Sequence, residues 1–232
     1  MCAAMSTTLQ RVQSTIAAVT ERRSVRRFLS TPVSEETIRA ILQAAVRTAS
    51  GTNIQPWSVH VVTGDSRDRL SRAVLHAAEA GEVCREYDYL PERLKEPYLS
   101  RRRKLGYALY ALYGVDRSDM AARKAAMLRN FTFFGAPVGL FFTMERDMAL
   151  GAWLDCGMFM QNVMIVARAY GLETCPQQAW CDFGAVVHRE LAIPDTHIVL
   201  CGMALGHADH SAIENTLVSE RIGVEDFATW HR

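Results

Sequence analysis

Four arginines stand within residues 22–28, "RRSVRRF", although the 232-residue chain is nearly neutral, with 26 lysines and arginines against 25 aspartates and glutamates. Guanidinium groups match phosphate oxygens with two parallel hydrogen bonds, and the Ser24 hydroxyl adds a further donor. The segment therefore fits a phosphate-binding site. It also fits a solvated basic turn, and the heptad alone favours the turn.

The overall charge narrows the choice of partner. A general nucleic-acid binder carries a broad basic excess, which a formal net charge of +1 does not provide. The same balance leaves no spare charge for an anionic membrane surface. The basic cluster therefore predicts a small anionic ligand that binds at this segment.

A second candidate is "SGTNIQPW", residues 50–57, between a predicted helix and a predicted strand. The amides of Asn53 and Gln55 pair donors with acceptors and suit the edge of a heterocycle. Gly51 allows a close approach of the backbone. The alternative is an ordinary helix-to-strand loop, which this stretch alone favours.

Two later stretches offer other chemistry. In "TCPQQAW", residues 174–180, backbone amides could face a ligand, or Cys175 could act as a nucleophile, although no histidine lies near it in sequence. In "GHADHSA", His207, Asp209 and His210 could bind a metal, but loop histidines at the surface are the favoured interpretation. HExxH, GxGxxG and Walker motifs are absent, so a Rossmann nicotinamide domain is not expected.

The cysteine pattern and the apolar segments indicate the compartment. The six cysteines form no CxxC pair and no zinc spacing, so we expect free thiols in a reducing environment. The first residues lack the apolar run of a secretory signal, and stretches such as "APVGLFF" are too short to span a bilayer. A soluble cytoplasmic protein is expected.

Hydrophobic periodicity predicts the elements that position these residues. Helices are predicted over 8–21, within "TPVSEETIRAILQAAVRTAS" with Ser34 as its cap, over 66–80, and over 151–170, which is apolar nearly all round and expected to be buried. Gly171 is placed to end that last helix. Strands are predicted at "WSVHVVTG", "APVGLFFTM" and "HIVLCGMALG", and "GLETCPQQAW" is expected to be a loop. Residues 81–118 are expected to form helical pieces over a surface.

The order of "RRSVRRF", "ASGTNIQPW", "GLETCPQQAW", "GMALGHAD" and "SERIGVEDF" resembles the nitroreductase family of FMN-dependent flavoproteins, from about residue 20 to the end. The stretches "EYDYLPERLKEPYLSRRRKLGYALY" and "RNFTFFGAPVGLFFT" resemble its nitrobenzoate-reductase-like branch. The resemblance implies one α+β domain over 1–232, a three-layer α-β-α sandwich around a mixed sheet, with a helical insertion at about 81–118. It also implies an intertwined homodimer with FMN at the interface and a C-terminal arm, about 213–232, that reaches the partner.

The resemblance also assigns site residues. Arg22, Arg23 and Ser24 would hold the FMN phosphate and ribityl chain, and Arg221 would hold the same phosphate. Arg26 would approach the N1/O2 edge of the flavin. The remaining members of the expected site are Ser50 and Asn53, with Gln55, from the partner subunit, Pro176 and Gln177 near flavin N5, and Gly206 in "GMALGHAD".

The reaction implied by the resemblance is ping-pong transfer. NADH or NADPH gives hydride to the flavin and leaves, and a nitroaromatic, quinone or related aromatic acceptor then binds in its place. No catalytic acid or base is assigned, and the choice between NADH and NADPH stays open. Alternatives are reductive dehalogenation, enone reduction, oxygen-dependent flavin cleavage, FMN storage without turnover, and an anion-binding adaptor with no cofactor.

Overall fold

The computed structural model describes residues 14–232, of which 14–20 are helical. Cys2 and the start of the helix expected over 8–21 lie outside the described residues. The centre of the fold is an antiparallel sheet in the order β1-β2-β4-β3. Its strands are β1 (Ser58–Thr63), β2 (Val138–Glu145), β3 (Glu173–Gln177) and β4 (His197–Gly206).

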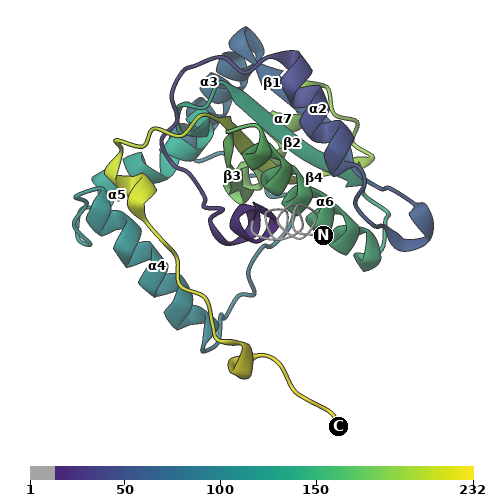
Figure 1. Cartoon of the computed structure of the whole chain (residues 1–232). Helices are drawn as coiled ribbons and strands as arrows, with labels where there is room; N and C mark the ends of the chain where they lie inside the picture. Colours follow the sequence, from purple (N-terminus) through teal and green to yellow (C-terminus); the bar gives the residue numbers. More distant parts are fainter. Residues whose placement is uncertain (1–13) are drawn as a thin grey trace.

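Helices cover both faces of this sheet and make three layers (Figure 1). Helices α2 (Glu35–Ala45) and α6 (Leu150–Ala169) pack together on one face, and α3 (Gly64–Ala80) and α7 (Gly184–Leu191) on the other. Successive side chains of a strand point to opposite faces. In β2, Leu140 and Phe142 therefore enter the core under α2 and α6, whereas Phe141 enters the core under α3 and α7. The predicted α+β sandwich is confirmed.

Local signals in the sequence explain where the helices begin and end. The Ser34 hydroxyl accepts a hydrogen bond from the Thr37 backbone N–H at 3.1 Å and caps α2 as expected. After α6, Gly171 adopts φ +67°, a left-handed conformation that glycine takes without strain. The strands expected at "WSVHVVTG", "APVGLFFTM" and "HIVLCGMALG" are confirmed as β1, β2 and β4.

The stretch "GLETCPQQAW" was wrongly expected to be a loop, because it contains β3. Gly171 and Pro176 are residues typical of turns, so the sequence pattern did not indicate a strand between them. β3 lies at the edge of the sheet, where a proline is tolerated because no neighbouring strand needs its missing N–H. The sheet was also expected to mix parallel and antiparallel strands, and this expectation is not met by the four strands. The four strands are antiparallel, and parallel pairing appears as a bridge between Ser24 and Thr174.

Helix α6 is less buried than its composition predicted. One side enters the core through residues such as Cys156, Phe159 and Val163, whereas Leu150 and Leu154 are 82% and 71% exposed. By length and mean hydropathy this helix could cross a membrane. One side of the helix packs against α2 and the sheet, and one such helix is weak evidence for a membrane span.

The insertion 81–118 contains one helix, α4 (Tyr98–Leu112), after an irregular stretch, so the expectation of helical pieces is met in part. Helix α5 (Met120–Leu128), which was not predicted, follows it. Both stand to one side of the sandwich, and the C-terminal segment runs beside α4 and then away from the body (Figure 1). Short 3-10 helices complete the chain: η1 (Gly51–Asn53), η2 (Arg129–Gly135), η3 (Gln178–Asp182), η4 (Ile213–Thr216) and η5 (Val224–Asp226).

Candidate functional site

A cavity of about 860 Å³ lies between the "RRSVR" segment, α4 and residues 217–222. We call two parts of its lining the inner wall and the outer wall. The inner wall consists of Arg22, Arg23, Ser24, Arg26 and Arg221, and the outer wall consists of Arg101, Arg102 and Lys104. Apolar and aromatic side chains, including Leu90, Leu94, Tyr98 and Leu105, line the same cavity, and its one acidic lining residue is Glu220.

The inner wall is attached to the edge of the sheet. The Val25 backbone N–H donates to the Thr174 carbonyl of β3 at 3.1 Å, and Ser24 forms the parallel bridge to the same residue. Val25 is buried in the core, so the alternation of an extended chain turns its neighbours Ser24 and Arg26 toward the cavity. The sequence therefore presents these polar side chains from a fixed backbone.

Arg168, at the end of α6, holds the residue that precedes the two leading arginines. Its guanidinium donates to the Glu21 carbonyl oxygen at 3.1 Å and to the Glu21 carboxylate at 3.1 Å. It also donates to the Glu173 carboxylate of β3 at 2.7 Å. Burial raises the pKa of Glu173, and the charges of Arg168 and Arg22 act in the opposite direction. Arg168 thus ties the start of the inner wall to α6 and to the sheet.

A second tie joins the inner wall to the C-terminal segment. Arg129 donates to the Arg26 carbonyl oxygen at 2.8 Å and to the buried Glu214 carboxylate at 2.6 Å. The backbone N–H of Arg26 donates to the Asn215 side chain at 2.8 Å. Because Glu214 and Asn215 precede the stretch that carries Arg221, these contacts help to bring Arg221 toward the cavity.

Arg22 forms no ion pair with a described residue, although the charge of Glu173 on β3 acts on it. Among residues 14–232 its guanidinium makes no hydrogen bond or ion pair, and burial, followed by the charge of Arg221, lowers its pKa. Arg221 donates to the Ser219 hydroxyl at 2.7 Å and to backbone carbonyls of its own loop. Two neighbouring guanidinium groups facing one cavity without an anion form a site that a phosphate dianion would complete. The residues present therefore fit the phosphate of FMN.

The expected residues of the "SGTNIQPW" loop do not line this cavity. Ser50 accepts a hydrogen bond from the Gln55 backbone N–H at 3.1 Å, and the Gln55 side chain donates to the Asn53 carbonyl oxygen at 3.1 Å. The backbone of Asn53 and Gln55 is left-handed, with φ values of 64° and 52°. Gly51 donates to the buried Asp155 of α6 at 3.1 Å, so the loop is tied to that helix.

Three other expected residues lie in or beside the sheet. Pro176 is half-buried in β3. The Gln177 side chain is buried, donating to the Asn130 carbonyl oxygen at 2.6 Å and accepting from Trp180 at 3.4 Å. Because the side chain already has partners, only the backbone of Gln177 is available to a ligand. Gly206 is explained by packing, because a Cβ there would lie 2.7 Å from the Pro137 ring.

The alternative chemistries are not supported by these positions. Cys175 is buried, and burial raises the pKa of its thiol to about 11, so it carries no thiolate near neutral pH. Asp209 accepts from the Ser211 backbone N–H at 2.9 Å and stabilises a turn. Within residues 14–232 no group of three potential metal ligands gathers, and the described cysteines are free thiols.

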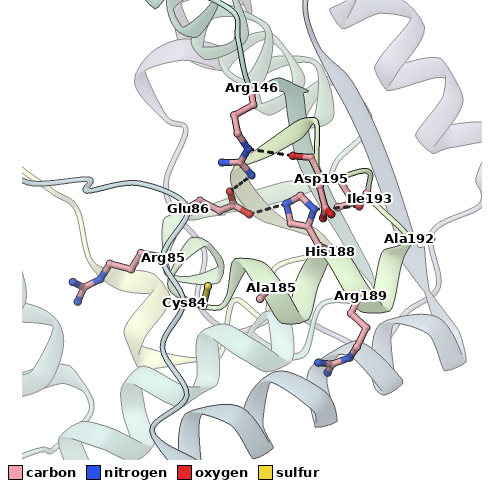
Figure 2. A pocket seen from close by; sticks show the side chains of 10 residues that line it. All are labelled: Cys84, Arg85, Glu86, Arg146, Ala185, His188, Arg189, Ala192, Ile193 and Asp195. Atoms are coloured by element: carbon pink, nitrogen blue, oxygen red, sulfur yellow. Dashed lines mark hydrogen bonds and ion pairs between the residues drawn. The ribbon is translucent and has the colours of Figure 1, made fainter.

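A second cavity, of about 560 Å³, lies at the start of the insertion (Figure 2). Its central carboxylate, Glu86, lies 2.8 Å from the Arg146 guanidinium and 2.7 Å from His188 Nε2. The other ring nitrogen of His188 lies 3.1 Å from the Ile193 carbonyl oxygen. Figure 2 shows these side chains pointing at one another rather than into free space. The group anchors residues 84–86 to α7, the end of β2 and the start of β4, which indicates a structural role.

Several residues of the first cavity were missed from the sequence. The outer wall lies in "SRRRK", a visible run of charge to which no role was assigned. Arg129 and Arg168 stand alone in apolar surroundings, in "MLRNF" and "VARAY". A lone arginine within an apolar stretch is a signal for a buried partner, but the sequence does not name that partner.

The comparisons with known proteins agree with the geometry. The family model described as "Nitroreductase family" matches residues 19–207. The chain is 40% identical over 211 residues to a 4-nitrobenzoate reductase of Pseudomonas putida, covering 91% of this chain and 92% of that protein. It is 40% identical over 218 residues to a nitrobenzene nitroreductase of Ectopseudomonas oleovorans, with 91% and 94% covered.

Solved structures give the same picture. The FMN- and NADPH-dependent nitroreductase NfnB from Sphigopyxis sp. strain HMH superposes with a TM-score of 0.92 at 39% identity, covering 94% of this chain and 99% of that one. The FMN-dependent nitroreductase NfnB from Mycobacterium smegmatis, in complex with NADPH, has a TM-score of 0.92 at 29% identity, with 95% and 99% covered.

Proposed function

Because the chain belongs to the nitroreductase family, we propose that it is an FMN-dependent oxidoreductase that passes reducing equivalents from NAD(P)H to nitroaromatic acceptors. The observation that carries this function is the inner wall, where Arg22 and Arg221 face one cavity and neither guanidinium forms an ion pair with a described residue. FMN, when bound, supplies the redox chemistry of hydride acceptance and donation. The chain's own residues bind it, orient it and tune its surroundings.

The inner wall divides this work between its residues. Arg22, Arg23 and Arg221, with the Ser24 hydroxyl, hold the phosphate through charge-assisted hydrogen bonds. Arg26 lies farther along the same segment, and its guanidinium donates to the Ser24 carbonyl oxygen at 3.1 Å. In our proposal it faces the N1/O2 edge of the flavin and supplies a fixed positive charge there.

The edge of the sheet at β3, next to the inner wall, would supply the other flavin contacts from the same subunit. Pro176 and the backbone of Gln177 would contact the flavin near N5, and Gly206 lets the neighbouring strand pack close to Pro137. Ser50, Asn53 and Gln55 would reach the flavin from a second subunit, since they do not line the cavity of their own chain.

We propose that the second subunit comes from a homodimer built on the exposed side of α6. Leu150, Leu154 and Met158 follow one another at helical spacing and are 82%, 71% and 45% exposed. A soluble protein rarely leaves such a stripe uncovered. The loop with Asn53 is tied to the same helix, so a copy that covers α6 also receives this loop.

The C-terminal arm fits the same assembly. Phe227 and Trp230 are 64% and 66% exposed on a segment that extends away from the body (Figure 1). In the dimer these side chains would be buried on the partner. The free thiols of the described cysteines agree with the reducing cytoplasm, which we propose as its location.

The test is a purification followed by two titrations. The protein is expected to bind one FMN per chain and turn yellow. NADPH or NADH should bleach this colour without oxygen, and 4-nitrobenzoate or nitrobenzene should restore it. A yellow protein that neither cofactor bleaches would support storage, and a protein that stays colourless with added FMN would refute the proposal. Recovery of colour with halophenols or enones but not with nitroaromatics would change the acceptor class.

A further inference from the structure

The outer wall holds positive charge that the FMN phosphate does not require. Seven cationic side chains and one carboxylate line the cavity, while FMN brings one phosphate. Lys104 is paired with that carboxylate, Glu220, at 2.7 Å. The side chains of Arg101 and Arg102 make no hydrogen bond or ion pair with any residue from 14 to 232, so two guanidinium groups remain available at this side of the cavity.

The outer wall lies at an exposed rim. Helix α4 contributes no buried residue, and Tyr98 and Leu105 beside the arginines are 60% and 38% exposed. The Arg101 guanidinium stands 5.8 Å from the centre of the Tyr98 ring, which gives the rim a flat cationic and aromatic surface. A rim of this kind suits the far end of a long ligand whose reacting ring lies deeper, beside the inner wall.

We propose that Arg101 and Arg102 bind the 2′-phosphate of NADPH, with Tyr98 beneath the adenine, and that the enzyme therefore prefers NADPH to NADH. This inference rests on the proposed function, since it places the nicotinamide at the flavin. A phosphate dianion matches two neighbouring guanidinium groups, whereas the free 2′-hydroxyl of NADH needs no cation. A carboxylated acceptor is a short monoanion whose nitro group must reach the flavin, so it does not need charge at the rim.

Helix α4 provides a matched control within three consecutive residues. Arg101 and Arg102 line the cavity, whereas Arg103, which follows them, does not. Changing Arg103 removes the same charge from the same helix without touching the cavity. Because α4 has no buried residue, all three substitutions should leave the fold intact.

The experiment compares Arg101→Gln/Arg102→Gln with Arg103→Gln in the FMN-loaded protein. We expect kcat/KM for NADPH to fall about tenfold in the double variant, the size of effect that loss of a charge-assisted contact produces, and kcat/KM for NADH to change less than about twofold. Arg103→Gln should leave both values near those of the unmodified enzyme.

Calorimetric binding of two nucleotide probes gives a readout that needs no turnover. Adenosine 2′,5′-bisphosphate should bind the FMN-loaded protein more tightly than adenosine 5′-monophosphate, and the double variant should lose this difference. The probe result stands even if no nitroaromatic is reduced, so the failure of the proposed reaction and the failure of this site are distinguishable.

Three results would overturn the inference. The first is equal loss with NADPH and NADH, which would indicate general attraction of the pyrophosphate. The second is an equal effect of Arg103→Gln, which would indicate long-range charge. The third is an unchanged preference between the cofactors together with a raised KM for 4-nitrobenzoate but not for nitrobenzene, which would assign the arginines to the acceptor carboxylate.

Discussion

The two walls of the cavity are built in opposite ways. The inner wall lies on the edge of the sheet, with Val25 buried at 5% exposure and its backbone bonded to Thr174. The outer wall lies on α4, which has no buried residue. Side chains on a backbone fixed to the sheet suit a ligand that stays, whereas side chains on an exposed helix suit a ligand that enters and leaves at each turnover. The difference agrees with our proposal that the inner wall binds the flavin and the outer wall the exchanging substrate.

The largest expected loss of FMN affinity comes from removing the second subunit. This change tests whether the inner wall of one chain binds FMN without the partner. Apart from its own helix backbone, no described atom lies within 4 Å of the position that a Cβ would take on Gly157, on the exposed side of α6. Gly157→Trp should therefore fold as a protomer but clash with a partner. We expect monomers in sedimentation, with FMN affinity reduced by more than about a hundredfold.

The control for this substitution is Ala80→Trp, at the exposed end of α3 on the opposite face of the sheet. It adds the same bulk and should remain dimeric and yellow. A Gly157→Trp protein that is monomeric yet keeps its FMN would show that one chain completes the site.

The next effect tests the phosphate contacts of the inner wall. Arg22→Ala removes charge-assisted hydrogen bonds of about 1.5–3 kcal/mol. FMN affinity should fall roughly ten- to a hundredfold, measured by the quenching of flavin fluorescence. Arg221→Ala should act in the same direction, less strongly, because its side chain is exposed. Unchanged affinity in both variants would remove the phosphate assignment.

Only part of this arrangement could be predicted from the sequence. The charge run in "RRSVRRF" marked Arg22 as a candidate, and the resemblance to the nitroreductase family assigned Arg22 and Arg221 to the phosphate. The capped helix after Ser34 and the strand "HIVLCGMALG" were predicted because their periodicity is local. The strand β3 and the exposed side of α6 were not, because both depend on neighbours distant in the chain or in another subunit.

Positioning residues were hidden for the same reason. Arg168 is one arginine in an apolar helix, and its partners Glu21 and Glu173 lie on separate elements. Gln177 is the opposite case, a residue that was expected to contact the ligand but whose side chain has partners within the protein. The resemblance placed Gln177 near flavin N5, yet its side chain is hydrogen-bonded to Asn130 and Trp180.

A smaller effect tests how the inner wall is held. Arg168→Met keeps the apolar length of the side chain but releases Glu21, the residue before Arg22. We expect FMN affinity to fall about fivefold at a temperature well below the unfolding midpoint, since a positioning contact contributes about 1 kcal/mol. Arg168→Lys should restore part of the affinity.

The matched control is Arg189→Met, which breaks an exposed pair with its neighbour Glu190 on α7. Loss of thermal stability without any change in FMN affinity would make Arg168 a purely structural residue.

The smallest effect on binding concerns Arg26, which is half-buried at the cavity. Arg26→Met should leave the affinity for oxidised FMN within about threefold of the original. Reduction puts negative charge on the flavin edge, so loss of a cation there should lower the midpoint potential by tens of millivolts, where about 30 mV corresponds to 1.4 kcal/mol. Spectroelectrochemical titration measures this shift. An unchanged potential with lost flavin would make Arg26 another phosphate ligand.

The most direct test of the two-wall account is the equilibrium dissociation constant of FMN, measured side by side for Arg22→Ala and for Arg101→Gln/Arg102→Gln. The account predicts at least about tenfold weaker binding in the first protein and less than about twofold change in the second. Equal weakening in both proteins, or weakening in the outer-wall variant alone, would contradict the division of the cavity between a resident flavin and an exchanging substrate.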